Sequence, residues 1–294
     1  MSVLETDSQI YPVTDKVVQS SDITSVKYIS VKLQNMTKQH IFTQMILERE
    51  EPALFSNPRS EQIAAFAEEA VTAEDQPKVR LLADLDEIKD ALHSFLTASK
   101  IAELIHREQL SLRTLTEPVQ NTIFTTESET VVPVMDNHSI SSSDPELVSS
   151  VYGEFDSRFE AAEQYHLRTP ALSVVKETLR EEIGDDIAAE FDEVLAHAEE
   201  ISNSSEYLSI VEIMLILAAR NEILLYDISK WGEDTGIASK ATFSRAKSAL
   251  EDAGLIETEK VPLDIGRPRL RLIATDELAT ADLKTLSTEI QSSL

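Results

Sequence analysis

The chain has 294 residues, 53 acidic against 26 basic side chains, a net charge of −27 and no cysteine. The missing cysteines exclude disulfides, thiolate catalysis and cysteine-ligated metals. An acidic balance normally argues against a nucleic-acid partner, yet apolar periodicity along most of the chain indicates folded domains rather than an acidic disordered protein. We interpret the charge as an adaptation to high salt, where dense surface carboxylates keep a folded protein hydrated.

The N-terminal residues 1–35 differ from the rest, with four acidic and three basic side chains. Two interpretations stay open: an extension upstream of a native start at Met36, or a flexible N-terminal tail. No basic region followed by an apolar core opens the sequence, so no secretory signal is expected. The longest apolar run, residues 213–219, is far shorter than the roughly 20 residues that span a bilayer, and we expect a cytoplasmic protein.

Residues 36–168 predict an α/β domain, because helical and strand patterns alternate along them. We expect helices at 39–50, 61–72, 85–108 and 145–165, and strands at 53–55, 78–82, 111–115, 121–126 and 130–135, the last two forming a hairpin. This order predicts a partly parallel sheet covered by helices. It is similar to one half of a phospholipase-D-like fold, an analogy that says little about function by itself.

No catalytic constellation marks this α/β domain. The first of six glycines is Gly153, so no glycine-rich phosphate loop follows any predicted strand. The six histidines are scattered, and no two of them have the three- to five-residue spacing that would let them bind one metal ion from the same helix. His138 stands where a phospholipase-D-like nucleophile would, but Ile140 replaces the lysine that such a site needs, so we interpret His138 as a loop residue. We expect no enzyme, no cofactor and no metal, and a role in sensing or dimerisation.

Residues 169–203 form an acidic helical connector, with ten acidic and two basic side chains. Its apolar stripe comprises Val174, Leu179, Ile183, Ile187, Phe191, Val194 and Leu195. Either the connector packs within its own chain, or it forms a dimer and sets the spacing of two DNA-binding domains. We favour a homodimer, the common arrangement for such DNA readers. A helix expected over residues 276–294 would add to that interface.

Residues 204–275 have the order of a winged helix-turn-helix domain. Helices are expected over 207–220 and from Leu224, followed by a glycine-containing turn, a helix over 239–253, and two strands flanking a basic tip. Ser239 can cap the third helix, and Gly254 stands where a helix needs a left-handed stop. Such a third helix enters the major groove while the wing lies on the backbone or minor groove.

The candidate DNA contacts are short hydroxyls and long cations, the side chains that contact phosphates and base edges. Between Ser239 and Arg271, seven basic side chains face five acidic ones, a basic island in an acidic chain. The candidates are Ser239, Lys240, Thr242, Ser244, Arg245, Lys247 and Ser248 on the helix, and Arg267 and Arg269 on the wing, residues 262–271. The expected partner is double-stranded promoter DNA. The alternatives are an ordinary surface helix, or a winged helix that contacts protein rather than DNA.

The run RNEILLYDISKWGEDTGIASKATFSR, residues 220–245, and KVPLDIGRPRLRL, residues 260–272, resemble the haloarchaeal TbsP-type transcriptional regulators. The resemblance continues more loosely upstream and ends before about Met36. It implies a DNA-binding regulator of a halophilic archaeon, with links to sugar and central carbon metabolism. We therefore expect a sequence-specific regulator whose α/β domain senses a small-molecule metabolite or a partner.

Overall fold

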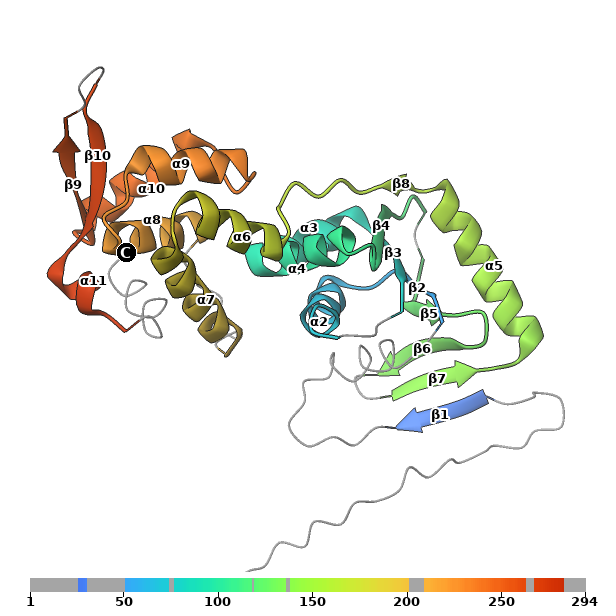
Figure 1. The fold of residues 1–294 in the computed structure, drawn as a ribbon. Coiled ribbons are helices and arrows are strands. Elements are labelled where there is room, and N and C mark those ends of the chain that lie inside the picture. The colour runs from blue at the N-terminus through green and yellow to red at the C-terminus, as the bar shows by residue number, and fades with distance from the viewer. Residues whose placement is uncertain are drawn as a thin grey trace, which may run out of the picture. The chain divides into compact units, whose positions relative to one another are not determined.

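The computed structural model describes residues 26–30, 51–73, 77–117, 119–135, 138–200, 209–262 and 267–282. The chain divides into two compact units (Figure 1). Unit 1 comprises residues 1–97 and 104–166, and unit 2 comprises residues 98–103 and 167–294. The helix expected at 39–50 and the centre of the wing, residues 263–266, lie outside the described residues, as does the C-terminal helix beyond residue 282.

Unit 1 is built on a mixed sheet that has eight strands in the described part of the chain, in the order β1-β7-β6-β5-β2-β3-β4-β8. Strands β2, β3 and β4 are parallel to one another, and every other neighbouring pair is antiparallel. The strands are β1 (Val26–Ser30), β2 (Ala53–Ser56), β3 (Val79–Ala83), β4 (Leu110–Thr114), β5 (Ile123–Thr125), β6 (Thr130–Met135), β7 (His138–Ser142) and β8 (Glu163–Gln164). The prediction of a partly parallel sheet with helices is confirmed.

Helices pack on both faces of this sheet because its central strands are apolar on both sides. The helices are α2 (Ser60–Ala70), α3 (Leu85–Ala91), α4 (Phe95–His106) and α5 (Pro145–Ala161). On one face, Phe55 of β2 meets Phe66 of α2 edge to face, with ring centroids 6.0 Å apart. Leu54, the neighbour of Phe55, points to the opposite face and lies in one buried cluster with Phe155 and Phe159 of α5.

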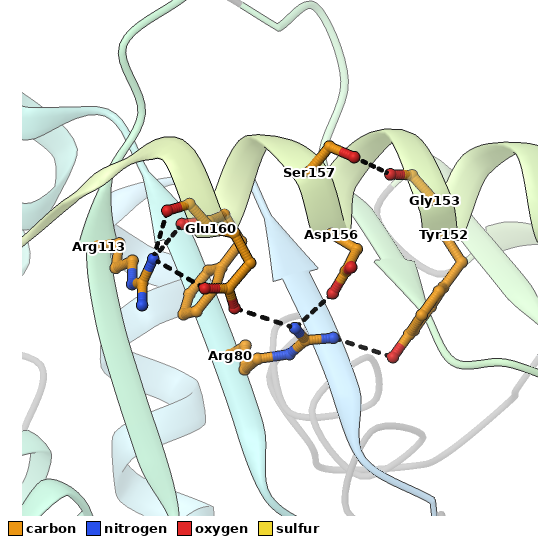
Figure 2. Close-up of polar contacts among 8 residues, drawn as sticks. Arg80, Arg113, Tyr152, Gly153, Asp156, Ser157 and Glu160 are labelled. Atoms are coloured by element: carbon orange, nitrogen blue, oxygen red, sulfur yellow. Dashed lines mark hydrogen bonds and ion pairs between the residues drawn. The ribbon is translucent and has the colours of Figure 1, made fainter.

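Two arginines from neighbouring strands hold α5 on its face of the sheet (Figure 2). Arg80 of β3 pairs with Asp156 and donates to the Tyr152 hydroxyl at 2.9 Å. Arg113 of β4 donates to the carbonyl oxygens of Phe159 and Glu160 at 2.6 and 3.0 Å, so its positive charge lies at the C-terminal end of α5. A cation there is favourable because the helix dipole is negative at that end.

Two expectations for unit 1 are wrong. The single helix expected over residues 85–108 is two helices, α3 and α4, separated by a turn at residues 92–94. His138 is no loop residue, because it begins β7 and is paired with Met135 of β6. Within residues 1–35, Val26–Ser30 forms β1 and pairs antiparallel with β7.

Unit 2 contains a winged helix-turn-helix fold, as expected. Its elements are α6 (Leu172–Glu182), α7 (Asp185–Glu200), α8 (Ile210–Arg220), α9 (Leu225–Asp234), α10 (Lys240–Asp252), β9 (Ile256–Val261), β10 (Arg269–Ala274) and α11 (Asp276–Thr280). Strands β9 and β10 pair antiparallel, and Leu224 adds a bridge to Arg271. The core between the helices and the hairpin includes Leu217, Trp231, Phe243 and Leu272, all essentially inaccessible to solvent.

Most of the apolar stripe of the connector is buried within its own chain. Leu179, Ile187, Phe191, Val194 and Leu195 are buried, whereas Val174 and Ile183 are partly exposed. The indole Nε1 of Trp231 in α9 donates to Thr178 Oγ1 of α6 at 3.1 Å. Helices α6 and α7 are therefore part of unit 2, which agrees with the alternative that the connector packs on its own chain.

The start of α6 takes its cap from another helix. The N-cap residue Ala171 has no side chain able to accept a hydrogen bond. Glu103, in the part of α4 that belongs to unit 2, accepts from the Ser173 N–H at 2.9 Å and from the Ser173 hydroxyl at 2.6 Å. Ser99 of the same segment donates to the Pro170 carbonyl oxygen at 2.9 Å. These bonds join residues 98–103 to the first turn of α6.

Candidate nucleic-acid interface

Helix α10 begins and ends where the sequence indicates. Ser239 Oγ accepts the Thr242 backbone N–H at 3.2 Å, which satisfies one of the free amides of the first turn. Gly254 has a φ of 70° and follows the last turn, where Leu255 N–H bonds to the Leu250 carbonyl oxygen at 3.0 Å. The Ser239 and Thr242 hydroxyls also lie 3.0 Å apart, so both contribute to the helix start.

The inner face of α10 is fixed by two side chains and one glycine. Phe243 and Leu250 are fully buried. The ring of Phe243 lies directly against Gly232 of α9, so closely that a Cβ atom at that position would overlap it. This contact brings α9 and α10 together across the helix-turn-helix and fixes which face of α10 is left to solvent.

The exposed residues of α10 form one continuous face, because they recur at steps of three and four. They are Lys240, Ala241, Ser244, Arg245, Ser248, Ala249 and Asp252. Small side chains alternate along this face with hydroxyls and cations, so it can approach a groove closely. Four predicted contacts, Lys240, Ser244, Arg245 and Ser248, lie together here.

Arg245 is the most available cation on this face. Its Nε donates to the Ala241 carbonyl oxygen and its Nη2 to Thr242 Oγ1, both at the long distance of 3.4 Å. Among the described residues it has no acidic partner. Its side chain therefore lies along its own helix and can move to a base edge without breaking an ion pair.

Lys240 is held by an acidic side chain of the preceding helix. Its Nζ lies 2.7 Å from Glu233 Oε2 of α9. The hydrogen bond between them, helped by their mutual attraction, raises the pKa of Lys240 and lowers the pKa of Glu233, and desolvation opposes both shifts without reversing them. A similar pair within α9, Lys230 with Asp234, has its side-chain atoms 2.7 Å apart. The positive charge beside the turn is thus largely balanced in the free protein.

Lys247, also a predicted contact, lies off the exposed face. Its side chain is only 13% exposed, and its Nζ lies 2.6 Å from Glu251 Oε2. Glu251 also accepts from Thr258 of β9 at 2.8 Å. Burial alone would raise the pKa of Glu251, but the hydrogen bonds from Lys247 and Thr258 outweigh it and lower that pKa. This cluster joins α10 to the wing.

The cations of the wing differ in whether they have an acidic partner. Arg267 is exposed, and neither it nor Lys260 of β9 has an acidic partner in the described part of the chain. Arg269 of β10 lies 3.2 Å from Asp227 of α9 and stacks on the Tyr226 ring, 4.0 Å from its centroid. The free cations can contact phosphates, whereas Arg269 joins the wing to α9.

Tyr226 was not among the sequence candidates. Its side chain is 45% exposed, which is unusual for a large aromatic, and it lies in the first turn of α9 beside Arg269. The partner in the stack is 43 residues away in sequence, so no local pattern indicates it. The one signal in the sequence was an aromatic residue in the first turn of a predicted helix.

The fold and the exposed helix define a winged-helix DNA-binding protein. Two family models cover nearly the whole chain: "Transcriptional regulator TbsP-like, N-terminal" over residues 30–170, and "Transcriptional regulator TbsP-like, C-terminal HTH domain" over residues 171–291. The chain belongs to the TbsP-like transcriptional regulators, which confirms the resemblance found in the sequence. The N-terminal match starts before Met36.

Two solved structures have partial likeness to the chain. One is TrmBL2, an archaeal chromatin protein, with 16% identity and a TM-score of 0.36 over 50% of this chain and 56% of that one. The other is the phospholipase D family member Nuc from Salmonella typhimurium, with 10% identity and a TM-score of 0.33 over 43% and 89% of the two chains. Both scores are too low to support an argument about fold or function.

A comparison with curated proteins finds no match. Within the residues that the structure describes, no helix combines the length and the apolar character needed to cross a bilayer.

Proposed function

We propose that the protein regulates transcription by sequence-specific DNA binding, with α10 in the major groove and the β9–β10 hairpin on the backbone. The observation that carries this proposal is Arg245, an exposed guanidinium at the centre of the outer face of α10 with bonds to its own helix alone. Arginine can bond both acceptors of a guanine edge at once, which is the commonest specific contact in the major groove. Ser244 and Ser248 flank it on the same face.

The proposed setting is the cytoplasm of a halophilic archaeon. The net charge of −27 supports it, because dense surface carboxylates keep a folded protein hydrated and soluble in concentrated salt. Counterion release also weakens as salt rises. Binding would then depend on base contacts and on shape rather than on net charge.

We include a homodimer in the proposal, because two recognition helices read a longer operator than one. Most of the connector stripe is buried within the chain, so the dimer contact would come mainly from other surfaces. The sheet domain is proposed to sense a metabolite, with genes of sugar and central carbon metabolism as targets. The support for these targets is the family resemblance.

Genome-wide occupancy of the tagged protein in its own cells, with and without sugar, tests the proposal. We expect sharp peaks at promoters that change with sugar. Sharp peaks that do not change with sugar would overturn the sensing role but would still support sequence-specific DNA binding. The absence of peaks, together with no enriched motif after in vitro selection of random DNA, would favour a winged helix that contacts protein.

A further inference from the structure

A cleft of about 480 Å³ lies in unit 1 where strands β3 and β4 begin. Its polar lining includes Lys78, Arg80, Gln109, Ser111, Gln164 and Tyr165. In the sheet, Arg80 is the register partner of Ser111, and the Tyr165 N–H bonds to the Leu112 carbonyl oxygen at 3.0 Å. The backbone bonds of the sheet therefore fix the positions of these lining residues relative to one another. Its volume is within the usual range for small-molecule sites, about 300–1,000 Å³.

Two cations line the cleft beside the start of β3. Lys78 is the residue before the strand and Arg80 is its second residue. Arg80 shares its charge with Asp156 and Glu160 of α5, as Figure 2 shows for its contacts. Lys78 is exposed and has no acidic partner among the described residues, so it is the cation available to a ligand, and Glu108 is the carboxylate that also lines the cleft.

One residue of the lining has an unsatisfied hydrogen-bond acceptor. Gln109 Oε1 is buried and has no hydrogen-bond partner. Leaving such an atom without a donor costs free energy, because the group has lost its water. A turn of the Gln109 side chain toward the cleft would let a ligand hydroxyl supply the missing donor, and the hydroxyls of Ser111 and Tyr165 could bond further polar groups.

We propose that this cleft binds a small polyhydroxylated molecule that carries one phosphate or carboxylate group. The anion would lie at Lys78 and beside Arg80, and a hydroxyl would donate to Gln109 Oε1. The inference rests on the proposed sensing role of the sheet domain and gives that role a site and a ligand class.

Isothermal titration calorimetry on the full chain, without DNA and at one fixed potassium chloride concentration, tests it. The probes are glycerol 3-phosphate, glycerate, glycerol and inorganic phosphate. We expect at least one of the two polyol anions to bind more tightly than glycerol and inorganic phosphate do. Lys78→Ala should weaken that binding about tenfold or more, since it removes a charged hydrogen bond. Whichever polyol anion binds identifies the anionic group.

The matched control is Lys89→Ala, which removes the same charge from an exposed lysine of α3 that does not line the cleft. It should leave binding unchanged. Gln109→Met should reduce the affinity for the polyol anion to that for inorganic phosphate, and unfolding midpoints equal to that of the parent would show that each variant folds.

Three results would overturn the proposal: no heat with either polyol anion, binding that Lys78→Ala leaves intact, or equal affinities for the polyol anion and inorganic phosphate in the parent. Because no DNA is present, a failure here is separate from a failure of DNA binding, which is measured independently on the same preparation.

Discussion

Lys240 and Glu233 form an ion pair across the helix-turn-helix, with 2.7 Å between Nζ and Oε2. Lys240 is the first residue of α10, and Glu233 lies in the last turn of α9. Both side chains are exposed. A DNA phosphate that binds Lys240 would have to displace the Glu233 carboxylate. Glu233 therefore competes with DNA for this lysine.

Glu233→Gln should therefore strengthen DNA binding. The substitution removes a carboxylate whose pKa is lowered, and which is thus ionised at neutral pH, and it frees Lys240 for a phosphate. We expect the slope of log K against log salt to steepen by about 0.9, the value for one additional phosphate contact. Fluorescence anisotropy over a salt series measures it. Glu177→Gln, which removes an exposed carboxylate of α6, is the control, and an equal effect of both would show only a change in net charge.

Arg245→Ala should weaken specific binding by about 1–3 kcal/mol and relax the preference at one base pair. Arg267→Ala should weaken binding more evenly across sequences, since a wing cation contacts the backbone. Anisotropy with the selected operator and with a scrambled duplex separates the two effects. If both variants bind like the parent, these residues are not contacts.

Lys247→Met should act on stability rather than on recognition, although the sequence places Lys247 among the contacts. The substitution keeps the apolar stem and breaks a partly buried ion pair, so we expect a loss of about 1 kcal/mol in the free energy of unfolding. The specific DNA affinity of the folded variant should change less than that of Arg245→Ala. A larger loss of affinity would return Lys247 to the interface.

The same cluster predicts a pH dependence. The folded-state pKa of Glu251 is below its ordinary value of 4.5, so its contribution to stability is complete above 4.5 and declines as the pH falls through the folded value. Glu251→Gln should make the unfolding midpoint less dependent on pH in that acidic range. Thermal unfolding of parent and variant from neutral pH to pH values below 4.5 measures the difference.

Tyr226→Ala should weaken DNA binding through the wing. Loss of the ring removes the stack on Arg269, worth about 0.5–1 kcal/mol at an exposed site, and leaves Arg269 with Asp227 alone. Tyr226→Phe keeps the ring and should resemble the parent. If the phenylalanine variant is as weak as the alanine variant, the hydroxyl rather than the stack is what matters.

Gly232→Ala should destabilise the DNA-binding unit by about 1–3 kcal/mol, because the new methyl group overlaps the buried ring of Phe243. Gly153→Ala is the matched control. Gly153 lies in α5 with open space around its Cβ position, and alanine there should stabilise by about 0.5–1 kcal/mol. Denaturant unfolding measures both, and equal stability of Gly232→Ala and the parent would contradict the packing described for α9 and α10.

Elements with marked ends were predictable from the sequence. Helix α10 begins after Ser239 and ends before Gly254 because both signals are local. The predictions fail where local signals are weak or absent. Strand β7 consists of histidine, isoleucine and three serines, a composition that does not suggest a strand, and it owes its place to pairing with β6 and β1. The turn after α3 contains neither glycine nor proline, so nothing marked it.

The face of α10 was predictable from periodicity, but the state of each cation only in part. Lys247 has Glu251 four residues further along the helix, whereas Arg245 has Ala249 there, so helical spacing already indicates an ion pair for Lys247 alone. The bond from Thr258 of β9 to Glu251 and the partner of Arg269 depend on how the hairpin meets the helices. These longer-range contacts form only in the folded domain, so no short-range pattern indicates them.

The hydrogen bonds that Ser173 donates to Glu103 bear on how the DNA-binding half can be produced by itself. The two family models meet between residues 170 and 171, which is where a fragment would naturally be cut. A fragment that starts there lacks the segment of α4 that caps α6, so the Ser173 amide would lose its carboxylate acceptor. Since α6 supports Trp231 through Thr178, the shortened protein would have a less stable recognition domain, although every residue expected to contact DNA is present.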